Sequence, residues 1–199
     1  MKKRLIAILT VMLLLLSSAA FAEDDGIARL PNKADELAKS LVTSKTTWVS
    51  QITGENSPNK TLSRFDVWGT DLGSMTEMNG KVYMFGGDTF SSEDSEGWRS
   101  NVLFVIDDDD PSDGLTIVDA VTDIEGHAKE LLGSMKRDNV QMTVIPTDIF
   151  AIDQTLYCIY MSVKHWNPQG GSWICGFSGL AKSTDEGQNW TKLDLRWDG

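Results

Sequence analysis

The sequence has few residues that catalyse or bind metals through sulfur or imidazole: its 199 residues include two cysteines and two histidines. We find no Ser-His-Asp arrangement, no glycine-rich phosphate loop and no His-x-x-x-His pair. Basic residues are also scarce, with 18 Lys and Arg against 29 Asp and Glu, which gives a net charge of −11. Such an acidic chain argues against nucleic acid or anionic lipid as a partner.

The two cysteines, Cys158 and Cys175, lie in strand-like segments on either side of a loop at residues 165–171. Folding this hairpin near residue 167 would bring them roughly opposite each other. An export compartment permits a disulfide, and two buried free thiols are the alternative. Their spacing does not suggest a metal site.

Long hydrophobic runs are absent after the first 22 residues. Residues 1–22 combine a basic start, an apolar run and an Ala-Phe-Ala cleavage site, which is the pattern of a secretory signal peptide. The run is too short for a membrane span. We therefore expect a secreted or periplasmic protein without membrane attachment after cleavage. Residues 23–63 predict a polar leader with a short helix from Lys33 to Val42.

Residues 64–199 predict an all-β domain, because short apolar runs alternate there with Gly, Asn, Asp and Ser. One helix is predicted at residues 127–135. Strands are predicted near residues 65–70, 81–86, 101–106, 115–119, 142–152, 155–163, 172–183 and 189–195. Many short antiparallel strands favour a sandwich, a barrel or a propeller.

A local motif from Ser183 to Trp190 matches the Asp-box, Ser-x-Asp-x-Gly-x-x-Trp. Its pattern predicts a tight hairpin in which Asp185 binds turn amides, Gly187 has a positive φ and Trp190 packs under the turn. The motif is common in β-propeller blades and is structural, so we give Asp185 no catalytic role.

Two aspartates in glycine-flanked segments are the candidate catalytic residues. Asp71 lies in Gly-Thr-Asp-Leu-Gly and Asp88 in Gly-Gly-Asp-Thr-Phe, and Asn79-Gly80 between them predicts a hairpin turn. Pairing about this turn would bring both carboxylates to the hairpin's open end. Glycoside hydrolysis needs such a pair, one as acid and one as base or nucleophile. The structural alternative is that both aspartates cap their own turns.

Other polar segments offer binding roles with structural alternatives. The run Asp107–Asp110 could ligate calcium, or it could form a solvated turn. Arg99, at a strand start beside a tryptophan, could hold a sugar hydroxyl or a carboxylate, or pair with a nearby acid. Trp166, before a glycine-rich loop, could stack on a sugar or pack within a hairpin.

The ordered series GTDLG, VYMFGGDTF, WRSNVL, TVIPTDIFAI, LYCIYMSVKHW and SGLAKSTDEGQNW resembles the domain-of-unknown-function family 4185. That family consists of secreted bacterial β-propeller proteins, and its characterised members are endo-acting D-arabinofuranosidases that cut D-arabinan. The resemblance covers about residues 64–197. It implies a five-bladed propeller with its site at the central channel.

By this resemblance Asp71 and Asp88 are the paired acids, and the substrate contacts are Arg99, Asn101, Asp148 and Trp166. The substrate would be a polysaccharide, with no metal or other cofactor required. Five blades need more than about 200 residues, so we expect either a propeller that is incomplete at its C-terminal end or a degenerate short form.

Two other functions fit parts of the sequence. A non-catalytic glycan-binding or adhesin-like propeller would keep the tryptophans and the Asp-box without needing a carboxylate pair. A sialidase-like enzyme would need an arginine cluster and a tyrosine nucleophile, and the chain has three tyrosines and no clear arginine triad. We therefore expect a glycoside hydrolase, with the glycan-binding protein as its alternative.

Overall fold

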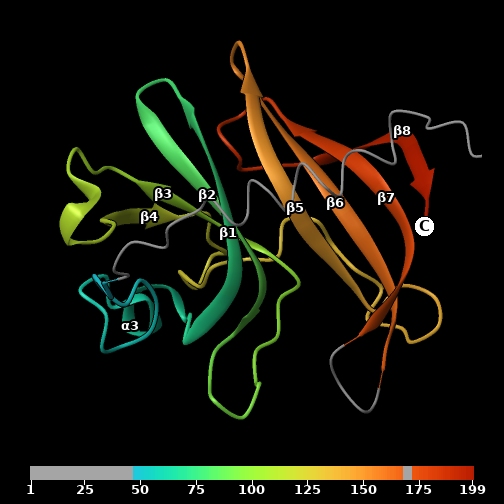
Figure 1. Ribbon diagram of the computed structural model, residues 1–199, viewed down its shortest axis with the longest axis horizontal. Coiled ribbons are helices and arrows are strands. Elements are labelled where there is room, and N and C mark those ends of the chain that lie inside the picture. Colours follow the sequence, from blue (N-terminus) through green and yellow to red (C-terminus); the bar gives the residue numbers. More distant parts are fainter. Residues whose placement is uncertain (1–46, 168–171) are drawn as a thin grey trace, which may run out of the picture. The chain divides into compact units, whose positions relative to one another are not determined.

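A computed structural model describes residues 47–167 and 172–199, and almost all of this part of the chain is strand or turn (Figure 1). The elements are helix α3 (Thr61–Phe65) and strands β1 (Gly69–Met78), β2 (Lys81–Phe90), β3 (Val102–Ile106), β4 (Ile117–Ala120), β5 (Thr143–Ile152), β6 (Thr155–Trp166), β7 (Trp173–Ser183) and β8 (Thr191–Asp198), with a 3-10 turn at Pro111–Asp113. Within the described ranges, no helix is long and apolar enough to cross a membrane. The all-β prediction is confirmed.

The strands form two four-stranded antiparallel sheets, ordered β1-β2-β3-β4 and β5-β6-β7-β8. Within each sheet, every strand pairs with its neighbour in sequence, so both sheets are antiparallel meanders. At the β1–β2 turn, Asn79 has φ 56° and Gly80 has φ 75°, the positive values that a two-residue hairpin needs. The predicted Asn-Gly hairpin is therefore confirmed.

The Asp-box forms the β7–β8 turn as predicted. Asp185 Oδ1 accepts a hydrogen bond from the Asn189 N–H at 2.9 Å, Gly187 has φ 85°, and the Trp190 indole N–H donates to the Gly187 carbonyl at 2.9 Å. The Trp190 ring lies 5.2 Å from that of Phe85 on β2. The hairpin of the second sheet thus packs on the first sheet.

The main core lies between the two sheets, with β1 next to β5 (Figure 1). Its fully buried members from both sheets include Phe85, Leu103, Val144, Leu156 and Cys158. Burying these apolar side chains from both sheets is the largest favourable contribution to folding. A second cluster, around Phe65 and Phe104, packs α3 against the outer face of the first sheet.

Two local predictions differ from the structure. The strand expected at residues 65–70 begins only at Gly69, since α3 and its cap occupy the segment before it. The helix expected at residues 127–135 is an irregular loop. Of the two alternatives for the cysteines, the structure has free thiols, because the register pairs Cys158 with Ala181 and Cys175 with Val163. The helix predicted at residues 33–42 and the signal peptide lie outside the described residues.

Candidate functional site

Asp71 lies at an irregularity in β1 that turns its carboxyl toward β2. Thr70 pairs with Thr89 while Leu72 pairs with Gly86, so the register shifts at Asp71. Leu72 has φ 60°, a left-handed conformation that is strained for a residue with a branched side chain. Asp71 Oδ1 lies over Gly87, where any Cβ would collide with it. The bare Gly87 backbone therefore makes room for the Asp71 carboxyl.

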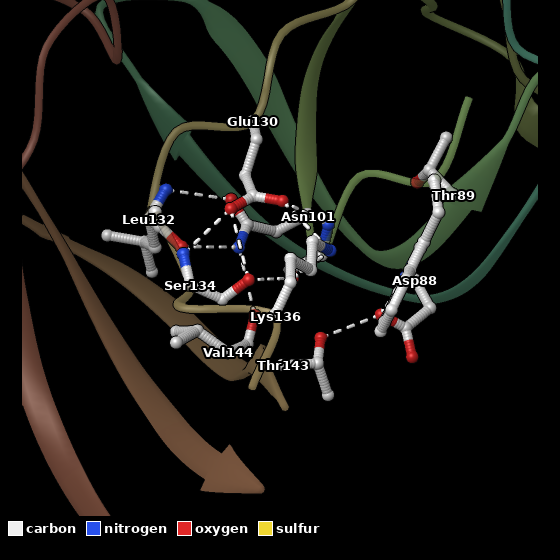
Figure 2. A network of polar contacts seen from close by, with 12 residues as sticks. Asp88, Thr89, Asn101, Glu130, Leu132, Ser134, Lys136, Thr143 and Val144 are labelled. Carbon is white, nitrogen blue, oxygen red and sulfur yellow. Dashed lines mark hydrogen bonds and ion pairs between the residues drawn. The ribbon is translucent and has the colours of Figure 1, made fainter. Parts of the chain in front are cut away.

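Asp88 lies on β2 and is held by side chains from two other segments. The Trp98 indole N–H donates to Asp88 Oδ1 at 2.7 Å, and the Thr143 hydroxyl of β5 donates to the same oxygen at 2.8 Å. Figure 2 shows Thr143 reaching toward Asp88 from the second sheet. One carboxylate oxygen is thus fixed by two donors.

The pKa values of both aspartates are raised above their ordinary value of 3.8. Burial raises the pKa of Asp71 most, the negative charge of Asp88 raises it further, and backbone hydrogen bonds, chiefly from Asp88, oppose the shift. Asp71 is nevertheless exposed, so solvent screens part of this repulsion. Burial also raises the pKa of Asp88, whereas the hydrogen bonds from Trp98 and Thr143 lower it. The two carboxyls form one electrostatically coupled site.

A polar network lies beside Asp88 in the loop before β5 (Figure 2). Lys136 Nζ lies 3.2 Å from Glu130 Oε2, and it donates to Ser100 Oγ at 2.7 Å. The N–H groups of Ser100 and Ser134 each donate to Glu130 at 2.7 Å. Burial alone would raise the pKa of Glu130, but these donors and Lys136 outweigh it and lower the pKa. Glu130 therefore stays ionised and holds Lys136 in place.

Arg99 and Asn101, which the family resemblance predicts as substrate contacts, both form hydrogen bonds to neighbouring loops. Arg99 donates to the carbonyls of Ala128 and Asp66 and to Ser91 Oγ. Asn101 is fully buried, and its amide makes four hydrogen bonds to the backbone of the loop at 131–132 and of Val144. Asn101 thus uses its whole amide to fix loops around the site, whereas Arg99 Nε is buried without a hydrogen-bond partner in the part of the chain that the structure describes.

Asp148 and Trp166 lie on the second sheet. Ser74 Oγ of β1 donates to Asp148 Oδ1 at 2.7 Å, so this carboxylate lies next to the strand that carries Asp71. Trp166 ends β6 with its ring 5.8 Å from that of Trp173. Thr143 pairs with Val163, three residues before Trp166, so the tryptophan pair lies near the Asp88 end of the sheet.

Sequence reasoning missed Trp98, Thr143 and Lys136. Trp98 follows a polar loop and Lys136 directly follows the segment predicted as a helix, so no pattern connects either residue to Asp88. Thr143 comes from the other sheet, and only the packing of the sheets brings it to Asp88. A hollow of about 350 Å³ adjoins Trp98 and Glu130, but neither Asp71 nor Asp88 lines it.

The aspartate run forms a turn. Asp108 accepts hydrogen bonds from the N–H groups of Asp110 and Thr116, and Asp110 accepts one from Ser112. In the described part of the chain, no cluster of three acidic, histidine or cysteine side chains could hold a metal ion. These hydrogen bonds support the turn interpretation of the run.

Together, these features define an all-β protein of two antiparallel meander sheets with paired carboxyls at the open end of the β1–β2 hairpin. The family model described as domain of unknown function (DUF4185) matches residues 56–198. The chain therefore belongs to this family, which confirms the resemblance seen in its motifs. No curated protein matches the chain.

Proposed function

We propose that the protein is a glycoside hydrolase that cleaves a furanoside polysaccharide, with endo-acting cleavage of D-arabinan as its activity. The observation that carries this proposal is the coupled pair Asp71 and Asp88, both with a raised pKa, on adjacent strands. Glycosidases need one carboxyl that is protonated and one that is ionised. The choice of D-arabinan rests on the resemblance to characterised members of the family.

The surroundings of the two carboxyls suit different roles. Asp88 Oδ1 accepts two hydrogen bonds, and the positive charge of Lys136 favours its ionised form. Asp71 is exposed, and burial together with the negative charge of Asp88 raises its pKa. In our proposal Asp71 is the general acid, and Asp88 is the base or nucleophile. The substrate would approach over Gly87 and the exposed side of Asp71.

The proposal includes an exported five-bladed propeller, of which the two described sheets are two blades. Four-stranded antiparallel meanders packed face to face are the units of such a propeller, and the Asp-box turn between β7 and β8 is common in them. Cleavage after Ala22 would release the chain from its signal peptide. N-terminal sequencing of the exported protein tests this step.

Reducing-end release from D-arabinan, L-arabinan and xylan tests the activity. We expect oligosaccharides from D-arabinan only, and a loss of nearly all turnover in Asp71→Asn and Asp88→Asn. A 4-nitrophenyl glycoside of a D-arabinan oligosaccharide then separates the roles, because its leaving group needs no protonation. Asp71→Asn should retain activity on it, whereas Asp88→Asn should not. If a cooperatively folded protein releases no reducing ends from any of the three polysaccharides, the result would favour the glycan-binding alternative.

A further inference from the structure

The Trp98 indole makes contacts through its ring face as well as through its N–H group. The Phe90 ring stacks beside it at 6.5 Å with an interplanar angle of 21°, and Lys136 Nζ lies 3.5 Å from the indole centroid. A sugar could not stack on the part of the ring that the ammonium covers. Trp98 therefore acts as a fixed hydrogen-bond donor to Asp88 at 2.7 Å.

Lys136 is itself fixed more firmly than a surface lysine. Glu130 and Ser100 bind its ammonium at 3.2 and 2.7 Å, and its side chain is 31% exposed. Its backbone has φ 50°, a left-handed conformation that costs free energy and persists only where its surroundings impose it. The loop before β5 thus places one cation on one indole.

We propose that Lys136 is a positioning residue that clamps the Trp98 indole against Asp88 and so fixes the orientation of this carboxylate. An ammonium over the ring attracts its electrons and makes the indole N–H a stronger donor. The charged groups around Asp88 are Asp71 on β1, with Glu130 and Lys136 on the loop before β5. Lys136 is the cation among them. This inference rests on the proposed role of Asp88.

Nuclear magnetic resonance tests the clamp without any assay of hydrolysis. Protein labelled with ¹⁵N at tryptophan and ¹³C at the aspartate carboxyls would be titrated with acid as wild type and as Lys136→Met, Lys136→Arg and Lys81→Met. Lys81 is the matched control, since it forms an ion pair with Glu186 at 3.0 Å, away from Trp98. Thermal melts report the folding of each variant.

In Lys136→Met we expect faster hydrogen exchange at the Trp98 indole, by about tenfold or more, and a higher pKa of Asp88. Lys136→Arg should restore both values toward wild type, and Lys81→Met should change neither. An indole resonance that is the same in Lys136→Met and wild type would overturn the clamp. If Lys136→Met does not fold, the acid titration of the wild-type protein decides. The Trp98 indole resonance should then shift with the same midpoint as the Asp88 carboxyl resonance. An indole resonance that does not shift at this midpoint would overturn the proposal.

Kinetics link the clamp to the reaction. If the chain hydrolyses D-arabinan, Lys136→Met should lower kcat by about 10- to 100-fold with a nearly unchanged KM, because a shifted carboxylate still allows substrate to bind. Its pH–rate profile should shift in the direction of the Asp88 pKa. If Lys136→Met shows faster hydrogen exchange at the Trp98 indole but keeps the wild-type kcat, the link between positioning and rate is refuted. A chain without hydrolase activity leaves the resonance test of the clamp intact and refutes the proposed function instead.

Discussion

The Gly87→Ala variant tests whether Asp71 works from the position in which it lies. The added methyl group would lie about 1 Å closer to Asp71 Oδ1 than van der Waals contact permits, and 3.0 Å from Leu72 Cδ1. The Asp71 carboxyl must therefore move away from Gly87. Because a displacement of about 1 Å at a catalytic group can cost about 100-fold in rate, we expect kcat on D-arabinan to fall by that order.

The stability cost of Gly87→Ala should be near the lower end for overpacking, about 1 kcal/mol, because the exposed Asp71 side chain can rotate toward solvent. Gly69→Ala is the matched control on the same hairpin, since a Cβ there would meet nothing within 4 Å. Initial rates and thermal melts of both variants give the comparison. Wild-type kcat in folded Gly87→Ala would refute the idea that the position of Asp71 sets the rate.

Three further predictions separate stability from chemistry. Asp71→Asn should raise the melting temperature at pH 7 but not at pH 3. At pH 3 Asp71 is protonated in the folded and the unfolded state, so its raised pKa does not change the free energy of unfolding. As pH rises through the folded pKa, the wild-type protein loses stability that the Asn variant keeps. Equal melting shifts at both pH values would contradict this. Asn101→Ala should cost about 3 kcal/mol or more in urea unfolding, because it removes four hydrogen bonds to backbone groups, three of them buried. Asp185→Ala should cost about 1 kcal/mol by loosening the Asp-box turn, and its kcat should match wild type; a lower kcat in the folded variant would argue against a purely structural turn.

The fold class could be predicted because the strand patterns and turn motifs are local. Asn79-Gly80 and the Asp-box each specify a hairpin within about eight residues, and each forms as predicted. The segment at residues 127–135 was predicted wrongly because its apolar residues suit a helix. In the structure, the buried amide of Asn101 captures the backbone of Leu131 and Leu132 instead. Such a long-range contact leaves no local pattern.

The candidate site could be predicted only as far as its hairpin extends. Asp71 and Asp88 share one hairpin, so the turn alone brings them together. Arg99 and Asn101 are expected substrate contacts from the family resemblance, and in the structure both also bind loop backbone. A buried polar side chain forms its hydrogen bonds within the protein. The partners of Asn101 lie 30 to 43 residues away in the chain, at Leu131, Leu132 and Val144, so no local pattern predicts them.

Two of the nine left-handed non-glycine residues in the described ranges belong to segments that build the candidate site. Leu72 and Lys136 both have left-handed backbones, and each conformation costs about 1–2 kcal/mol in a residue with a side chain. In β1 this conformation accompanies the register shift that turns Asp71 over Gly87. In the loop before β5 it accompanies the placement of Lys136 over Trp98. Each of the two strained conformations thus belongs to a local arrangement that places a side chain of the candidate site.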